Sequence, residues 1–422
     1  MRRCLALALL AACGSSTPPG PTRITAAIVP AVENRNVDVL FLIDDSSNSL
    51  EAGGDVRASF DAFTHVLAEH GLPSMHIGVA TSDLGTTAVG DAMPGPSFGG
   101  GPGACSGIGK AGTLQNPGNA VTGNFISDIA ATNGSRMTNY TGTLEDAFRS
   151  IAAVGANGCG FEQHLEAITK ALGPNSNNAG FLRPDANLAI IVVADEDDCS
   201  LEHTSLIDPS RTDEFGPFES FRCTHFGITC NVGGTTPDAM NAAGVKDECH
   251  SNEQSPYLTH IADHVAFLQG LKPDPRMEMM ATLVGPPAPF DVELRAPVGG
   301  MTPIPALMNT CDPPADALGA DPGVRLEQAA SNFARHTLGS ICPADEQPQL
   351  TLIAREIDSM MGSPCLTRDI AMPADCTAAD DAGTVTDFSI VEDDAMCPEG
   401  QHLRLQRGGT PAGATTVSCT VP

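Results

Sequence analysis

Positive charge is scarce in this chain of 422 residues, which has 22 lysines and arginines against 51 aspartates and glutamates. Only four of the basic residues are lysines, at positions 110, 170, 246 and 272. The formal net charge is −29. Nucleic acids and anionic membrane surfaces are bound through clusters of basic side chains. We therefore predict no nucleic-acid partner, and the acidity is typical of a protein kept soluble outside the cell.

Two motifs with well-defined chemistry are also missing. The glycine-rich residues 99–103 lack the Lys-Ser/Thr pair of a phosphate-binding loop. No Cys-x-x-Cys pair occurs, which argues against zinc held by thiolates. Beyond the N-terminal leader, no segment is apolar enough to span a membrane.

The N-terminus has the pattern of an export signal. Arg2 and Arg3 precede the short apolar run 5–12, and the sequence Leu-Ala-Ala-Cys ending at Cys13 resembles a bacterial lipobox. We predict a signal peptide over 1–12, a lipid on Cys13 that anchors the chain to a membrane, and a flexible tether over 13–35. An ordinary secretory signal is the alternative. The predicted location is the cell envelope, either the periplasm or the outer-membrane or cell surface.

Twelve cysteines remain after the leader and Cys13 are set aside, and an even number in an exported chain indicates disulfides. Spacing alone does not fix the pairing. We predict Cys105–Cys159 and Cys342–Cys365.

Two continuous apolar runs end in clusters of acidic residues. The run 39–43 is followed by Asp44, Asp45 and Ser46, and the run 186–194 is followed by the acidic residues 195–198. Such runs are typical of strands buried on both faces of a parallel sheet. Open α/β sheets bind ligands at the carboxyl ends of their strands. Oxygen ligands favour a hard divalent cation, Mg²⁺, Ca²⁺ or Mn²⁺.

The segment VDVLFLIDDSS, from Val37 to Ser47, resembles the first strand of a von Willebrand factor A domain with its Asp-x-Ser-x-Ser metal-ion-dependent adhesion site. The resemblance implies that Asp44, Ser46 and Asn48 are metal ligands and that Asp195 is a fourth. A frame one residue later, Asp45, Ser47 and Ser49, stays open.

The middle metal loop of the family supplies a threonine that is missing here, where Cys159 takes its place. Gln163 or Glu162 could compensate for the threonine. Asp83 and Asp197, which also follow predicted strands, complete the set of possible additional metal-site residues.

The resemblance implies an α/β fold with a doubly wound, mostly parallel sheet over 36–369. We expect a disulfide-held insert over 199–256 and a small β-rich region over 370–422. Residues 75–81 and 276–284 are predicted strands. Predicted helices cover 55–70, 144–154, 161–172, 257–270, 326–337 and 350–361.

The function that the resemblance implies is binding rather than catalysis. We expect a lipid-anchored adhesion module that recognises an extracellular or envelope protein. One alternative is an exported zinc hydrolase, because His260 and His264 share a predicted helix face and HxxDH is similar to an inverted zinc motif. Another is a structural envelope protein without a working metal site.

Overall fold

The computed structural model describes residues 22–46, 50–296, 302–311, 319–343, 347–368, 370, 372, 375–397 and 402–421. The predicted signal peptide, Cys13, Ser47, Asn48 and Ser49 lie outside the described residues. Within the described parts, no helix is long and apolar enough to cross a membrane.

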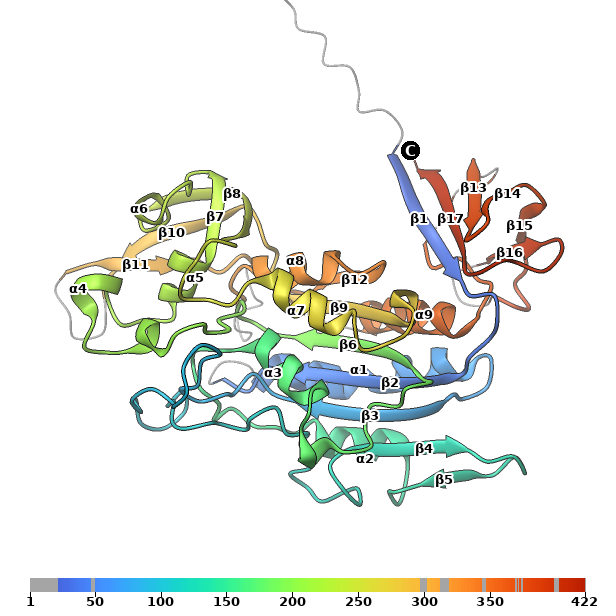
Figure 1. Ribbon diagram of the computed structural model, residues 1–422, viewed down its shortest axis with the longest axis horizontal. Helices are drawn as coiled ribbons and strands as arrows, with labels where there is room; N and C mark the ends of the chain where they lie inside the picture. Colours follow the sequence, from blue (N-terminus) through green and yellow to red (C-terminus); the bar gives the residue numbers. More distant parts are fainter. Residues whose placement is uncertain are drawn as a thin grey trace, which may run out of the picture.

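The central sheet is mixed and has the strand order β12-β9-β6-β2-β3-β4-β5 (Figure 1). Strands β12 to β3 run parallel to one another, while β4 and β5 are antiparallel. The predicted strands are present, and β2, β3, β6 and β9 are almost fully buried, which explains their continuous apolar runs. The bounds are β2 Asn36–Ile43, β3 Ser74–Ala80, β4 Ile126–Ala130, β5 Arg136–Thr138, β6 Asn187–Val193, β9 Glu278–Val284 and β12 Arg335–Ser340.

Helices cover both faces of this sheet (Figure 1). One face carries α1 (Leu50–Ala68), α2 (Leu144–Ile151) and α9 (Gln347–Met361). The other carries α3 (His164–Leu172), α7 (Ile261–Leu268) and α8 (Val324–Ser331). Alternate residues of β2 serve the two cores: Phe41 packs against Phe148 on the first face, and Leu40 belongs to the second.

Several predicted helices begin or end at other residues in the structure: α1 begins at Leu50 rather than residue 55, and α3 at His164 rather than residue 161. Residues 335–337 belong to strand β12, because the helical spacing stops at Phe333 and burial then alternates with period two. Helix α7 begins at Ile261 rather than residue 257. The residues before it run extended, and Leu201 and Leu258 form an isolated β-bridge.

The insert is larger than predicted, because two separate segments build it. Between β6 and α7 lie α4 (Thr212–Phe215), α5 (Phe221–Gly227), β7 (Ile228–Val232), α6 (Pro237–Met240) and β8 (Gly244–Ser251). After β9, strands β10 (Phe290–Arg295) and β11 (Ile304–Leu307) complete a second sheet of order β11-β10-β8-β7. Figure 1 places this insert at the end of the molecule opposite the C-terminal sheet.

The predicted tether differs from the structure, since Thr22–Val29 form strand β1. Ala26, Ala27 and Val29 are buried with residues of the C-terminal region, so this part of the chain is held by apolar packing. Strand β1 pairs with β17 (Thr415–Val421), and the sheet continues through β13 (Cys376–Asp380) and β14 (Gly383–Val385). Strands β15 (Phe388–Glu392) and β16 (Leu403–Arg407) pair separately.

The twelve cysteines form six disulfides among the described residues. The predicted pair Cys105–Cys159 is present. The predicted pair Cys342–Cys365 is wrong: Cys342 bonds Cys311, which follows β11, and Cys365 bonds Cys397. The remaining bridges are Cys199–Cys223, Cys230–Cys249 and Cys376–Cys419.

Candidate metal centre

Asp44 and Asp195 leave the same edge of the central sheet. Strands β2 and β6 pair in parallel with Ile43 opposite Val193, and the backbone N–H of Asp44 donates to the carbonyl of Val193 at 2.9 Å. Both carboxylates are buried. Burial and the nearby Asp44 charge raise the pKa of Asp195 to about 7. The two strand ends that carry these acidic residues lie side by side at one edge of the sheet.

The Asp44 carboxylate is held by three donors of the protein. Its Oδ1 accepts from the backbone N–H of Ser46 at 2.8 Å and from the Ser82 hydroxyl at 3.1 Å. Its Oδ2 lies 3.4 Å from Nε2 of His164, a fully buried residue at the start of α3. Burial opposes ionisation of Asp44, but these hydrogen bonds and the His164 charge lower its pKa.

His164 lies where a protonated imidazole would act as an internal counterion of Asp44. Burial favours the neutral imidazole, yet the contact with Asp44 raises the pKa of His164 above its ordinary value. A protonated imidazole beside Asp44 supplies the positive charge that a bound cation would otherwise bring. No sequence motif marks this histidine, although it directly follows the loop in which a replacement for the missing threonine was expected.

Gln163 does not compensate for the missing threonine in this arrangement. Its Nε2 donates to the carbonyl of Thr87 at 2.9 Å, and its Oε1 accepts from the N–H of Leu201 at 3.2 Å. The side chain joins two loops instead of facing Asp44. Cys159, at the place of the threonine, forms a disulfide with Cys105 and therefore has no free thiol.

Asp45 has its own cation. Its Oδ2 pairs with the ammonium of Lys110, while its buried Oδ1 has no hydrogen-bond partner among the described residues. Burial raises the pKa of Asp45 to about 6, and Lys110 opposes that rise. A side chain at Gly158 would place its Cβ 2.4 Å from Asp45 Oδ1, so this close approach requires glycine.

Asp83 and Asp197 stabilise local backbone. Asp83 accepts from the N–H of Gly85 at 2.9 Å and closes a turn. Asp197 accepts from the N–H groups of Arg325 and Leu326 in the first turn of α8, where a carboxylate favours the helix dipole. Neither residue contributes to the contacts around Asp44.

The described residues contain no group of three or more His, Cys, Asp or Glu side chains already arranged to hold a metal ion. Asp195 nevertheless keeps an oxygen, Oδ1, that is buried without a hydrogen-bond partner among these residues. Such an oxygen is costly unless a ligand or water satisfies it. Oδ1 of Asp195 is thus available to a ligand at this edge, next to the Asp44 carboxylate that contacts His164.

The histidine pair of the hydrolase alternative is not assembled. His260 precedes α7 as its N-cap and is partly exposed, whereas His264 lies within α7 and is buried. Both ring nitrogens of His264 are occupied, Nδ1 by the Thr169 hydroxyl at 3.0 Å and Nε2 by the Thr259 hydroxyl at 2.7 Å. The early start assumed for this helix produced the apparent zinc motif.

The structure does not support a serine nucleophile either. Residues 95–99 match the letters Gly-x-Ser-x-Gly, but Ser97 is exposed in an irregular segment between β3 and β4. A nucleophile elbow requires a tight strand-turn-helix connection.

No model of a known protein family matches the chain, and no curated protein matches it. Solved structures that resemble it include a von Willebrand factor type A protein from Catenulispora acidiphila, with 11% identity, 96% of this chain and 66% of that chain covered, and a TM-score of 0.31. Two others are the pilus adhesin SpaC from Lactobacillus rhamnosus GG (8% identity, 94% and 40% covered, TM-score 0.33) and the pilus adhesin RrgA from Streptococcus pneumoniae (10% identity, 94% and 58% covered, TM-score 0.29). This chain spans less than two thirds of the length of each. Likeness at these TM-scores carries no information on function, which has to be inferred from the residues themselves.

Proposed function

We propose that this protein is a ligand-recognition module of the cell envelope, built on the doubly wound sheet of the von Willebrand factor A type, with a divalent-cation site at the C-terminal edge of β2 and β6. The observation that carries the proposal is the convergence of Asp44 and Asp195 at this edge, with Asp195 Oδ1 buried and unpartnered among the described residues. Asp44, Ser46, Asn48 and Asp195 are the proposed ligands, and Mg²⁺, Mn²⁺ or Ca²⁺ is the proposed ion.

The chemistry suits recognition better than catalysis. A site with few carboxylates and several neutral oxygens leaves the ion with residual positive charge, so that a carboxylate of a partner protein can complete its coordination. The insert follows β6 shortly after Asp195, and the Cys199–Cys223 disulfide joins its helix α5 to the loop that follows Asp195. Loops in such a position commonly determine which partner is bound.

Export fits the disulfide content. Six disulfides join cysteines throughout the described chain, which is typical of an oxidising compartment. We propose in addition that Cys13 carries a lipid that holds the protein at the periplasmic or outer surface of a membrane. Metabolic labelling with a fatty acid tests this, because a Cys13→Ser variant would lose the label.

Calorimetric titration with Mg²⁺, Mn²⁺ and Ca²⁺ tests the cation site, using the full chain with Cys13→Ser to prevent lipid attachment. We expect Asp44→Asn and Asp195→Asn each to weaken binding by about tenfold or more. Asp146→Asn, which changes an exposed carboxylate on α2, is the matched control and should bind as the unchanged protein does.

A structural role with no cation at this edge is the second candidate, and the contact between Asp44 and His164 favours it. In that case His164 permanently replaces the cation. Titrations that are unchanged by both Asp44→Asn and Asp195→Asn would establish this second role and contradict the first.

A further inference from the structure

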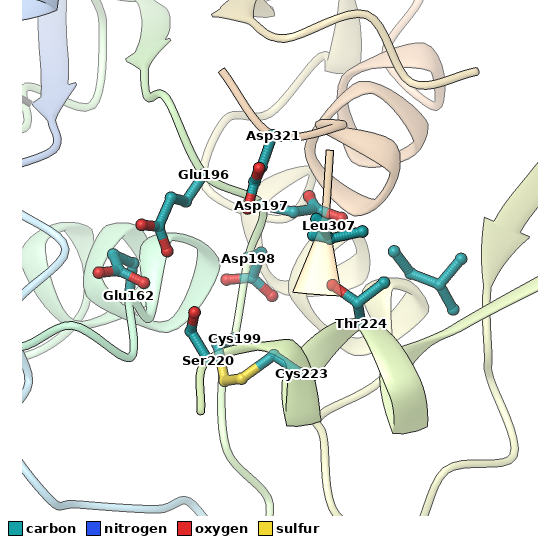
Figure 2. Close-up of a pocket in the computed structure, with 11 residues that line it drawn as sticks. Glu162, Glu196, Asp197, Asp198, Cys199, Ser220, Cys223, Thr224, Leu307 and Asp321 are labelled. Carbon is teal, nitrogen blue, oxygen red and sulfur yellow. A yellow bond between two sulfur atoms is a disulfide. The ribbon is translucent and has the colours of Figure 1, made fainter. Parts of the chain in front are cut away.

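Two of the cavities in the structure differ in the charge of the side chains that line them. The smaller one lies beside the candidate metal centre and is lined by carboxylic residues, Glu162, Glu196, Asp197, Asp198 and Asp321 (Figure 2). The larger one, of about 490 Å³, lies between strand β1 and the start of strand β12. It is lined by two arginines, Arg335 and Arg368, and by one acid, Glu356. A chain with a net charge of −29 thus has a cavity with an excess of arginine over acid.

The first arginine and the acid of this β1–β12 cavity neutralise each other. Arg335 is 1% exposed, and its Nη1 donates to Oε1 of Glu356 at 3.0 Å. Its Nε donates to the carbonyl of Arg276 at 3.0 Å, and its Nη2 donates to the carbonyl of Ile28 in β1. This buried pair joins β12 to α9 and β1, so it belongs to the framework of the fold and leaves the charge of Arg368 unbalanced.

Arg368 has no acidic partner among the described residues. Its Nη2 donates to the carbonyl of His336 at 3.4 Å. Arg222 and Arg407 also lack an acidic partner there, but each donates to several oxygen atoms at once. A guanidinium carries five N–H donors and binds a carboxylate through two parallel hydrogen bonds. Arg368 therefore suits recognition of a carboxylate in the cavity.

The cavity also exposes the edge of a sheet, because β12 is the last strand of the central sheet (Figure 1). The N–H of Ile341 donates to the carbonyl of Val284 in β9, and the backbone groups of successive residues in a parallel strand point to alternate sides. The backbone groups of His336, Leu338 and Ser340 therefore point away from β9. No other described strand pairs with them.

This edge lacks the features that usually prevent strand addition. Exposed edge strands are commonly very short, bulged, or protected by charged residues and proline. Residues 337–340 of β12 are Thr, Leu, Gly and Ser, and the Leu338 side chain is 41% exposed. By contrast, β5 at the opposite edge of the sheet has only three residues. Among the described strands of the central sheet, β12 thus offers the edge that suits addition of an extended chain.

Strand β1, on the other side of the cavity, is held by the chain itself. The carbonyl of Ala26 accepts from the N–H of Thr367 at 2.9 Å, and the carbonyl of Ile28 accepts from the Ser359 hydroxyl at 3.2 Å. Strand β1 therefore acts as a wall, to which Ile24 adds apolar surface. An extended ligand would pair with β12 and pack against this wall.

We propose that the β1–β12 cavity binds an acidic, extended segment of another protein, which adds to the free edge of β12 and places a side-chain carboxylate on Arg368. In strand addition, backbone hydrogen bonds supply affinity and a side-chain contact supplies specificity. The volume is within the range of ligand sites. A second copy of this chain is a poor occupant, because two chains of net charge −29 repel each other.

This surface is separate from the candidate metal centre. Strand β12 runs parallel to the other long strands of the sheet, so its start lies at the end of the sheet away from Asp44 and Asp195. Binding there needs no cation. The protein would therefore have two recognition surfaces, and each is tested without the other.

Calorimetric titration of the full chain carrying Cys13→Ser, in the presence of a chelator, tests the proposal. The probe is the peptide acetyl-Thr-Val-Glu-Val-Thr-amide, whose β-branched residues favour an extended chain and whose glutamate is its only charge. We expect saturable binding below about 1 mM. Replacing the glutamate of the peptide with glutamine should weaken binding by about tenfold, because a charge-assisted hydrogen bond is lost.

Variants of the protein separate the two contacts. Arg368→Gln should weaken binding of the glutamate peptide by about tenfold and leave binding of the glutamine peptide unchanged. Leu338→Pro removes an outward N–H, which an edge strand tolerates, and should weaken binding of both peptides. Leu338→Val keeps the N–H and is its control. Arg149→Gln, which neutralises an exposed arginine on α2, is the control for Arg368→Gln.

The possible outcomes are distinct. Absence of binding up to about 1 mM, or binding unaffected by both Arg368→Gln and Leu338→Pro, overturns the proposal. Loss with Arg368→Gln but not with Leu338→Pro would show a carboxylate site without strand addition and would also overturn it. Binding that appears only after Mg²⁺ is added would place the peptide at the candidate metal centre instead. A preference of Arg368→Glu for the peptide with lysine in place of glutamate would support the proposed contact.

Discussion

Strand β2 has a buried carboxylate near each end, and the two ends differ in how that charge is compensated. Near the N-terminal end, Asp38 is fully buried and accepts from Nε of Arg183 at 2.7 Å, with the ammonium of Lys272 at 3.8 Å. Burial raises the pKa of Asp38, while both cations oppose the rise. Glu278, also buried, accepts from the backbone N–H of Lys272 at 2.8 Å. Asp38 thus faces two cations of the chain, whereas Glu278 keeps one oxygen, Oε2, buried without a hydrogen-bond partner among the described residues.

Beyond the C-terminal end of β2 the acids outnumber the cations. His164 serves Asp44, but Asp195 keeps an unpartnered buried oxygen in the described structure. Burial raises the pKa of Glu162 well above its ordinary value, and its Oε1 has no hydrogen-bond partner among the described residues. An edge that serves only stability would be expected to resemble the other end, because uncompensated buried charge lowers stability.

The difference between the two ends of β2 indicates which end would bind an external ligand. Where the chain supplies its own counterions, the charges stabilise the fold and leave nothing for a partner. Where it does not, we propose that a cation from solution completes the site. Each prediction below changes one end of this comparison.

The largest effect is expected from Arg183→Leu. The substitution leaves Asp38 buried with only the more distant Lys272, and removing one partner of a buried ion pair costs about 3–5 kcal/mol. We expect the free energy of unfolding to fall by that amount, as measured by urea denaturation in the presence of a chelator.

Two variants complete the measurement. Arg149→Leu removes an exposed ion pair with Asp146 and should cost less than about 1 kcal/mol. Glu162→Gln should cost little in chelator, because it removes an uncompensated acid. A loss with Glu162→Gln as large as that with Arg183→Leu would show that the two ends do not differ.

A smaller effect is expected from His164→Gln, which removes the internal counterion but keeps a hydrogen-bond donor near Asp44. If His164 competes with a divalent cation, the variant should bind Mg²⁺ at least about tenfold more tightly, or about 1.4 kcal/mol. Calorimetric titration measures this directly. Equal or weaker Mg²⁺ binding would mean that His164 supports the site instead of competing for it.

Much of the sheet could be predicted from the sequence, because a strand buried on both faces leaves a continuous apolar run. Residues 37–43 and 186–194 were recognisable for this reason, and so was the acidic cluster after each. Strand β12 was not, since Leu326, Ala329, Ala330 and Phe333 continue a helical spacing up to its start. Cysteine spacing does not determine pairing, and Cys342–Cys365 was accordingly wrong.

Asp44 and Asp195 could be predicted from the sequence, but the residues that contact them could not. The meeting of Asp44 and Asp195 follows from two strand ends at one edge, which the pattern encodes. Their partners are tertiary: His164 lies 120 residues from Asp44 in sequence, and Lys110 lies 65 residues from Asp45.

The smallest expected effect is a pH dependence at the compensated end of the sheet. His70, just past α1, contacts Asp358 of α9 through Nδ1 at 2.8 Å and the carbonyl of Met396 through Nε2 at 2.9 Å. Its hydrogen bond with Asp358 raises the pKa of His70 to about 9, against about 6.5 in an unfolded chain. A raised histidine pKa gives stability that is fully present below about pH 6.5 and is lost as the pH rises through about 9.

We therefore expect the unchanged protein to be more stable than His70→Gln at pH 6 and the difference to disappear by about pH 9.5. The pair is partly open to solvent, so the difference should be on the order of 1 kcal/mol. Thermal unfolding of both proteins across this range measures it, and His65→Gln, an exposed change on the same helix, is the control. A difference that stays constant from pH 6 to 9.5 would show that folding does not shift the pKa of His70. In that case Asp358 would gain no stabilising charge from His70, and the contrast between the two ends would weaken.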